Sequence, residues 1–173
     1  MGSCDAVHRA LEQHGLLLLQ DKSLASVVGM IAGETLRGSW WSHAKAQEIF
    51  QCMERFRDDE VVSTRLAGGK VTFVHRSLWP ALLAVATCGE PWQKTSAKTK
   101  GELQKRLLMH GEEVHTESGR HELVLRPWSE WASRYGVEKM DSVEDARAQL
   151  EAAIVKIGGQ RSLLPWSRPR RPR

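Results

Sequence analysis

The chain has 173 residues, of which 41% are hydrophobic and 27% are charged. Globular proteins average about 45–50% apolar and about 25% charged residues, so wholesale disorder and fibrous architectures are excluded. The longest apolar run, residues 79–88, is much shorter than the ~20 residues of a membrane-spanning helix, so we expect no membrane partner.

The formal net charge of +4 is concentrated at one end of the chain. Residues 161–173 carry five arginines and no acid, and the other 160 residues carry 20 basic and 21 acidic side chains. Binding to nucleic acid would therefore depend on local patches rather than on the total charge. Three prolines among the arginines predict that 161–173 is a disordered tail that does not pack.

The cysteines Cys4, Cys52 and Cys88 are odd in number and have no metal-type spacing. This pattern argues against a disulfide framework and against a zinc ribbon, and it favours a reducing, cytoplasmic location. The chain contains no P-loop, GxGxxG, GxSxG or HExxH string, so we expect neither a metal nor a cofactor.

The first third of the chain predicts two helices separated by a short strand. Residues 6–15 form the first helix, with Asp5 as its N-cap and Gly15 as its left-handed C-terminal residue. Four leucines at 16–19 are too few for a helix and suit a buried strand or connector. The second helix covers Ser23 to Gly33, with Ser23 as its N-cap.

A third helix is predicted over Ser42 to Arg57, followed by a hairpin and a fourth helix. Apolar residues at steps of three and four form one buried stripe on the third helix: Ala46, Ile49, Phe50, Met53 and Phe56. The period then changes to two over 60–66 and 70–75, around Gly68-Gly69, which is a strong hairpin signal. Residues 78–87 form the fourth helix, capped by Ser77, with Pro80 in its first turn.

This order of elements resembles that of the winged helix-turn-helix superfamily. The resemblance is carried by the helices over 6–15, 23–33 and 42–57 and by the Gly68-Gly69 hairpin, which corresponds to the wing. It covers about half of the chain and includes no diagnostic short motif. It implies that the third helix enters the DNA major groove and that the wing contacts the backbone or minor groove.

The second half predicts an abbreviated repeat of the helix-plus-hairpin unit. A helix over 96–110 precedes strands over 112–117 and 121–125, and the amphipathic helix over 142–157 closes the body. We therefore expect an α+β, mostly helical protein with a winged-helix domain at 1–90 and a second unit at 91–160 packed on it. The alternative is that any hairpin followed by a helix gives such a match.

Five cations lie in the stretches 35–47 and 61–80, which contain no acid: Arg37, Lys45, Arg65, Lys70 and Arg76. Such a set predicts a phosphate-binding surface. Trp41 and His43 stand at the entry to the third helix, where an exposed Trp could stack on an unpaired base. The alternative is that Trp40 and Trp41 pack the helix onto the core, that His43 is structural, and that the cations form a solvated face.

The charged residues of the second hairpin are the candidates for acid–base catalysis. His115, Glu117 and His121 would serve, because imidazole titrates near neutrality. A three-residue turn would bring His121 beside Glu117, whereas a two-residue turn would separate them. The alternative is a solvated hairpin with a charged face, and the spacing matches no established zinc pattern.

A narrower resemblance is to winged-helix DNA glycosylases of the AlkZ/YcaQ type, which carry a Trp-Ala-His-Glu segment and a Gln-x-Gln or Gln-x-Asp motif. Residues 41–44 read Trp-Ser-His-Ala, and Gln20 is followed directly by Asp21, so the catalytic motif is not matched. Accordingly, no catalytic residue is carried over.

Three functions follow from these observations. The leading one is a cytoplasmic DNA-binding winged-helix protein, acting on duplex, single-stranded or damaged DNA. The second is a DNA-repair or processing enzyme, glycosylase-like, that uses the carboxylates and histidines of the second hairpin. The third is a protein-docking module, because winged helices also serve as scaffolds.

Overall fold

The computed structural model describes residues 2–167 and has a mixed α+β architecture. Its helices are α1 (Ser3–His14), α2 (Val27–Ala32), α3 (Ala46–Glu54), α4 (Trp79–Ala86), α5 (Lys100–Lys105), α6 (Trp128–Tyr135) and α7 (Val143–Lys156). Its strands are β1 (Leu16–Leu18), β2 (Val61–Thr64), β3 (Thr72–His75), β4 (His110–His115) and β5 (His121–Arg126). Within the described part of the chain, every helix is too short or too polar to cross a bilayer.

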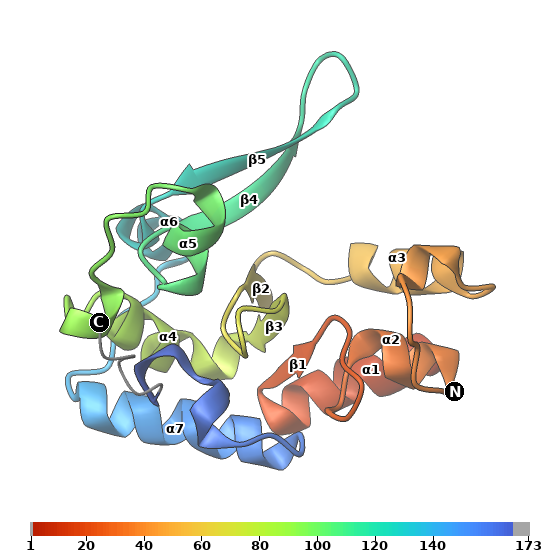
Figure 1. Cartoon of the computed structure of the whole chain (residues 1–173), viewed down its shortest axis with the longest axis horizontal. Helices are drawn as coiled ribbons and strands as arrows, with labels where there is room; N and C mark the ends of the chain where they lie inside the picture. The colour runs from red at the N-terminus through yellow and green to blue at the C-terminus, as the bar shows by residue number, and fades with distance from the viewer. Residues whose placement is uncertain (1, 168–173) are drawn as a thin grey trace.

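The N-terminal half is built around a three-stranded antiparallel sheet in the order β1-β3-β2 (Figure 1). The central strand β3 pairs with both neighbours, so that Val74 lies opposite Leu16 on one side and opposite Val62 on the other. Gly68 and Gly69 have φ values of 62° and 75° in the loop between β2 and β3. The predicted hairpin and its two glycines with positive φ are therefore confirmed.

Side-chain caps decide where the first two helices begin. Gly15, with φ 81°, ends α1 as predicted, but Asp5 lies inside the helix and its carboxylate accepts a hydrogen bond from the Gly2 N–H (3.2 Å). Helix α2 begins three residues later than expected, because Ser26 rather than Ser23 caps it by accepting from the Gly29 N–H (3.1 Å). The expected starts of both helices were wrong.

Helix α3 is shorter than predicted, and most of its predicted apolar stripe faces the core. Its helical residues are Ala46–Glu54, and Trp40–Ser42 forms a separate 3-10 turn, η1. Ile49 and Cys52 are buried, whereas Phe50 is 48% exposed. The apolar stripe read from the sequence therefore included one residue that faces solvent and omitted the cysteine that does not.

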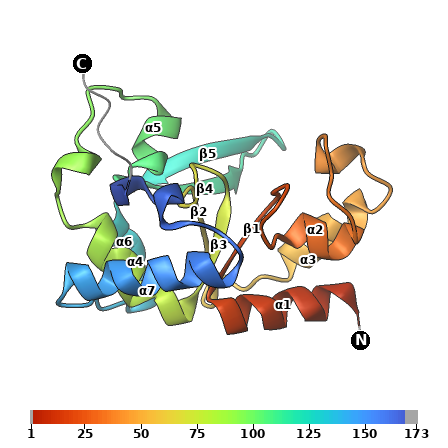
Figure 2. The same cartoon turned by 60° about the horizontal axis from the view of Figure 1, so that its bottom comes forward.

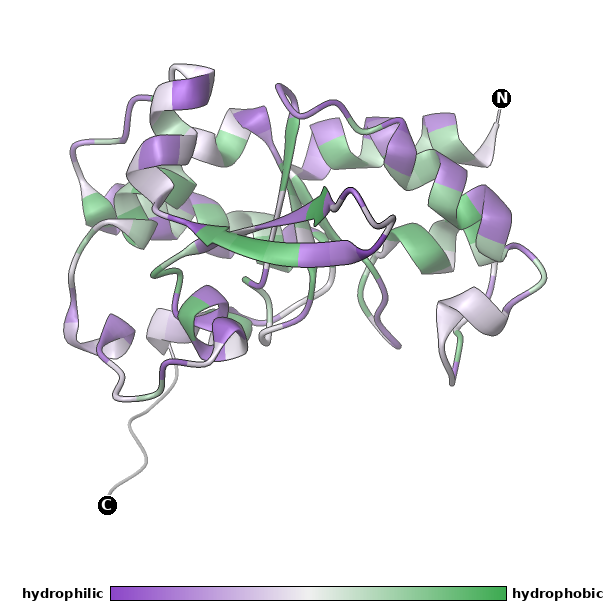
Figure 3. Cartoon of the chain, turned by 90° about the horizontal axis from the view of Figure 1, so that it is seen from above, coloured by the Kyte–Doolittle hydropathy of each residue, from purple (hydrophilic) through white to green (hydrophobic). Residues whose placement is uncertain are grey.

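The second half contains the predicted hairpin, with β4 beginning two residues earlier and β5 ending one residue later than expected. Helix α5 covers only six residues, after Thr99 caps it. The hairpin β4–β5 forms a sheet of its own and extends away from the body (Figure 1). Strand β5 is apolar over residues 123–125, whereas most of β4 and the tip of the hairpin are hydrophilic (Figure 3). Helix α6 follows immediately; we had not expected a helix there.

The two halves share one hydrophobic core. Helix α7 lies along α4 (Figure 2), and its residues Ala146, Leu150 and Ile154 are fully buried. Trp79 of α4 packs edge-to-face on Trp131 of α6, with ring centroids 5.0 Å apart. The second half thus completes the core of the first.

The segment after α7 packs on the body, contrary to the prediction of a disordered tail from residue 161. Leu164 is fully buried, and the Trp166 indole N–H donates to Glu151 (3.0 Å). The Leu163 carbonyl accepts a hydrogen bond from the Gly68 N–H (2.8 Å), at the tip of the β2–β3 hairpin. The prediction counted the arginines and prolines of this segment and overlooked its apolar residues Leu163, Leu164 and Trp166, which pack against the core. Residues 168–173 lie outside the described part of the chain.

Two adjacent residues of α7 test this packing. Ile154 is fully buried, so Ile154→Ala should lower the free energy of unfolding by about 2–5 kcal/mol. Val155 is 54% exposed, so Val155→Ala should change it by no more than about 0.5 kcal/mol. Urea unfolding followed by circular dichroism measures both. Equal effects of the two substitutions would contradict the placement of α7.

Candidate nucleic-acid interface

A pocket of about 680 Å³ lies between four segments that are distant in sequence. It is bounded by the loop after β1, the loop after α2, the tip of the β2–β3 hairpin and the segment after α7. We call it the basic pocket, and it is lined by Gln20, Asp21, Lys22, Ser23, Leu24, Leu36, Arg37, Lys70, Gly158, Gly159, Gln160, Ser162 and Leu163. Three cations and one carboxylate therefore surround one cavity.

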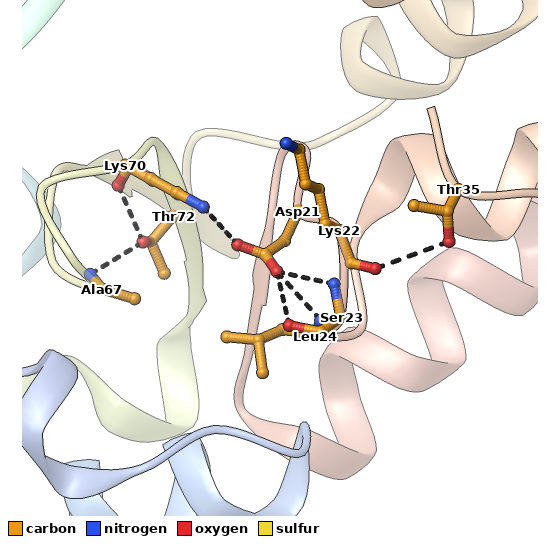
Figure 4. Close-up of polar contacts among 8 residues, drawn as sticks. All are labelled: Asp21, Lys22, Ser23, Leu24, Thr35, Ala67, Lys70 and Thr72. Atoms are coloured by element: carbon orange, nitrogen blue, oxygen red, sulfur yellow. Dashed lines mark hydrogen bonds and ion pairs between the residues drawn. The ribbon is translucent and has the colours of Figure 1, made fainter. Parts of the chain in front are cut away.

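The single carboxylate, Asp21, holds the pocket's polar contacts together (Figure 4). Its Oδ2 accepts from Lys70 Nζ (2.5 Å), and its Oδ1 accepts from the backbone N–H groups of Ser23 (2.9 Å) and Leu24 (3.0 Å). Burial raises the pKa of Asp21, but the hydrogen bonds from Lys70, Ser23 and Leu24 outweigh it and lower that pKa to about 2. Asp21 is therefore ionised at neutral pH and bound to Lys70.

Two further hydrogen bonds fix the loop after α2 against the loop after β1. The Gln20 side-chain amide donates to the Gly38 carbonyl (2.7 Å), and the Thr35 hydroxyl donates to the Lys22 carbonyl (3.5 Å; Figure 4). The first bond holds the carbonyl of Gly38, which follows Arg37 in the chain, and the second holds the carbonyl of Lys22 itself. The backbones that carry these two exposed cations are thus positioned before any ligand arrives.

The other predicted cations are placed elsewhere. Lys45 donates through Nζ to the Ile31 carbonyl (2.7 Å) near the C-terminus of α2. Arg65 donates to the Gly69 carbonyl within its own hairpin (3.4 Å). Arg76 is exposed beyond the far end of β3, where its backbone N–H bonds the Glu60 carbonyl (2.7 Å). The structure therefore brings Arg37 and Lys70 together and leaves these three outside the basic pocket.

The entry to α3 presents two aromatic residues in different environments. Trp40 is half-buried against the core, and Trp41 is 67% exposed, with the two rings edge-to-face at 6.0 Å. His43 lies between them and α3, and its Nε2 is 3.1 Å from Glu34 Oε1 while its Nδ1 accepts from the Lys45 N–H (3.1 Å). Packing explains Trp40, but it does not explain Trp41.

The three candidate catalytic residues of the second hairpin are arranged as neither of the two predicted turns would arrange them. His115 pairs with His121 across the strands, with ring centroids 4.2 Å apart. Glu117 lies in the turn, because the chain closes through the pair Thr116 and Arg120 (N–H to carbonyl, 2.9 Å). Both histidines are exposed, and the carboxylate near His121 is Glu113 (4.0 Å) rather than Glu117.

A more buried acid–base cluster stands at the base of the same hairpin, where sequence reasoning had not placed one. Glu112 accepts from Arg126 (3.2 Å) and Arg134 (2.7 Å), and it lies 3.5 Å from His110 Nε2. Burial lowers the pKa of His110, and its Nδ1 is buried without a hydrogen-bond partner in the structure. The charge pattern of the hairpin alone could not predict this cluster, because one of its members, Arg134, belongs to α6.

Cys4 and Cys52 are joined in a disulfide between α1 and α3, contrary to the expectation drawn from cysteine number and spacing. Spacing rules detect ligands or partners that are close in sequence, and these two are 48 residues apart. Cys88 is a free cysteine. The disulfide removes the basis on which a reducing compartment had been expected.

Comparison with protein-family models, with curated proteins and with solved structures gives no match for this chain. Functional inference therefore depends on the geometry alone. That geometry offers a preorganised pocket with three cations, an exposed tryptophan close to a short helix, and a partly buried histidine–glutamate–arginine cluster.

The low pKa of Asp21 makes a prediction about acid stability. A carboxylate with a pKa of about 2 in the folded protein, against an ordinary 3.8, stabilises the fold above pH 3.8 and loses that effect as the pH falls through about 2. Asp21→Asn should therefore lower the free energy of unfolding by roughly 2 kcal/mol at pH 7. The difference from the wild type should shrink between pH 4 and pH 2.

Chemical unfolding at a series of pH values measures this difference. Glu138→Gln is the control, because Glu138 is an exposed carboxylate outside the basic pocket. Its pH profile should run parallel to that of the wild type. A gap between Asp21→Asn and the wild type that stays constant down to pH 2 would refute the role given to the Asp21 carboxylate.

Proposed function

We propose that this chain is a DNA-binding protein of winged-helix type that contacts phosphates through the basic pocket. The observation that carries the proposal is the convergence of Lys22, Arg37 and Lys70 from three separate segments on one cavity. Phosphate contacts give nucleic-acid binding most of its sequence-independent affinity, and they are made mainly by Arg and Lys.

The topology of the N-terminal half supports the winged-helix part of the proposal. Helix α1 precedes β1, α2 and α3 precede β2, and the sheet order is β1-β3-β2. Winged-helix domains have this order of elements, and the β2–β3 hairpin corresponds to the wing. Lys70 lies at the tip of that hairpin, which the winged-helix resemblance would place against DNA, and Arg37 lies in the loop between α2 and η1.

The charges favour contact through the loops rather than through the face of α3. The outward residues of α3 include Gln47, Phe50, Gln51 and Glu54, and none is a cation. Glutamine can read base edges, but it does not neutralise phosphate. We therefore assign the electrostatic part of binding to the basic pocket and give α3 at most a role in contacting bases.

Removing pocket charges should weaken DNA binding in a salt-dependent way. For Lys22→Gln with Arg37→Gln, we expect lower affinity for a labelled duplex and a log–log salt slope smaller in magnitude by about 2, one unit per lost phosphate contact. Fluorescence anisotropy at several salt concentrations measures both. The matched control is Lys94→Gln with Lys139→Gln, which removes two exposed charges outside the pocket.

The control should bind as the wild type does. Equal behaviour of the two double variants, or no retention of DNA by the wild type at low salt, would contradict the proposal. Neither double variant should alter the circular dichroism spectrum, because all four side chains are exposed.

Trp41 allows single strands to be distinguished from duplexes. Stacking of a base on an exposed aromatic residue contributes about 1–3 kcal/mol. If Trp41 stacks on unpaired bases, Trp41→Ala should weaken binding to a single-stranded oligonucleotide by about 5- to 150-fold and affect duplex binding less. Because Trp41 is 67% exposed, the free energy of unfolding should change by less than about 0.5 kcal/mol. Equal losses for both DNA forms would argue against stacking.

Protein docking is the second candidate, and one observation favours it. Trp41 and Phe50 are two of the three large hydrophobic residues that stand exposed in the described part of the chain, and they belong to neighbouring elements. The anisotropy experiment separates the two candidates, because a docking module would bind DNA neither tightly nor with a salt slope that depends on pocket cations. An enzyme that uses His115, Glu117 and His121 has less support, since the structure separates Glu117 from the two histidines.

A further inference from the structure

Three potential metal ligands from two helices meet beside the disulfide. Cys4 and His8 lie one turn apart on α1, and Cys52 projects from α3. One ligand atom from each residue, the two sulfurs and a ring nitrogen, lies within 4.8 Å of the others. Among residues 2–167, no other group of histidine, cysteine, aspartate or glutamate side chains meets this condition.

His8 is the unusual member of this cluster. Its Nε2 is buried and has no hydrogen-bond partner, and its ring packs edge-to-face on Phe56 with centroids 5.1 Å apart. A buried imidazole nitrogen without a partner costs free energy, so a retained one calls for an explanation. The disulfide gives a reason for the two cysteines to be adjacent, but none for the histidine.

We propose that, when the disulfide is reduced, Cys4, His8 and Cys52 bind one Zn²⁺ ion, so that the disulfide and the metal are alternative occupants of one site. The proposal does not depend on the DNA-binding function. It departs from the expectation that the cysteines form no metal site, which was based on sequence spacing alone.

The two states are linked by balanced chemistry. A dithiol reductant supplies two electrons and two protons, which break the S–S bond and leave two thiols, and the reductant itself becomes a disulfide. Binding of Zn²⁺ then releases the two thiol protons to solvent and forms two Zn–S bonds and one Zn–N bond. Water takes the fourth position of the tetrahedral site, because the cluster provides three ligands.

The donor set selects zinc over the hard divalent cations. Thiolate and imidazole suit Zn²⁺, whereas Mg²⁺ and Ca²⁺ require oxygen ligands. The two thiolates carry two negative charges, which balance the two positive charges of Zn²⁺, so the occupied site is neutral. Neutrality matters because Cys52 is buried, and an unbalanced charge there would be costly.

Either occupant ties α1 to α3 at the same point. Two other polar contacts join α1 to α3 or to its end: the Ser3 hydroxyl donates to the Glu48 carboxylate, and Arg55 forms an ion pair with Asp5 (3.4 Å) whose side chains are both at least half exposed. Exposed pairs contribute little, about 0–1 kcal/mol. The disulfide or the metal ion is therefore the strongest of these direct links between α1 and α3.

The experiment uses the whole chain, reduced under anaerobic conditions with a phosphine reductant that is then removed. Zn²⁺ is titrated in competition with a chromophoric chelator, and Co²⁺ serves as a spectroscopic probe of thiolate ligation. The variants are Cys4→Ser, Cys52→Ser and His8→Gln, and Cys88→Ser is the matched control because Cys88 is a free cysteine outside the cluster.

We expect the reduced wild type and Cys88→Ser to bind one Zn²⁺ with equal affinity, and each cysteine variant of the cluster to lose binding. His8→Gln should bind at least about tenfold more weakly, since even loss of a group outside the first coordination shell costs 10- to 100-fold. On oxidation, His8→Gln should still form the Cys4–Cys52 disulfide, because only the two thiols react.

The oxidised wild type, which keeps its fold, should bind no Zn²⁺. Binding by the oxidised protein, equal affinities of the wild type and His8→Gln, or loss of binding in Cys88→Ser would each overturn the proposal. These outcomes remain informative if a cysteine variant unfolds, because His8→Gln and the oxidised protein test the same site independently.

Discussion

The burial of α4 is the constraint on which the rest of the structure depends. Its sequence is apolar on every side, and Ala81, Leu82 and Val85 are fully buried. A helix without a polar face must be surrounded, and the sheet of the first half cannot do this alone. Helices α6 and α7 supply the missing cover, so the two halves of the chain form one core rather than two.

That requirement also positions the basic pocket. Because α7 lies along α4, the segment that follows it passes the β2–β3 hairpin, where the Leu163 carbonyl accepts from the Gly68 N–H. The pocket wall formed by 158–163 exists only through this packing. Hydrophobic burial in the second half thus sets the geometry of charged groups in the first half. The local sequence pattern of either half gives no information about this coupling.

The sequence predicted well what depends on local rules. Gly15 and the glycine pair of the hairpin act as expected, because the preference for a positive φ is a property of single residues. The expected caps Asp5, Ser23 and Ser77 were wrong, since Gly2, Ser26 and Leu78 stand at the N-cap positions of those helices. The sequence failed where tertiary contacts decide: Lys45 bonds a helix end and Cys52 meets Cys4 across 48 residues. Of the predicted cations, Arg37 and Lys70 share the pocket, and no spacing rule indicates which members of a charged set converge.

The contact between Lys70 and Asp21 determines how the pocket can receive an anion. Asp21 is 9% exposed and Lys70 is 55% exposed, so the lysine head can approach a phosphate while the carboxylate stays beneath it. If Lys70 moved entirely from Asp21 to a phosphate, Asp21 would keep only its backbone donors, Ser23 and Leu24. The Asp21 carboxylate and the phosphate would then be two anions in one cavity. Under the proposed function, an incoming phosphate would therefore be shared with Lys70 and held chiefly by Lys22 and Arg37. The Asp21 carboxylate thereby opposes binding of any anion that the two exposed cations do not also neutralise, which favours a polyanion with several phosphates over a single free ion.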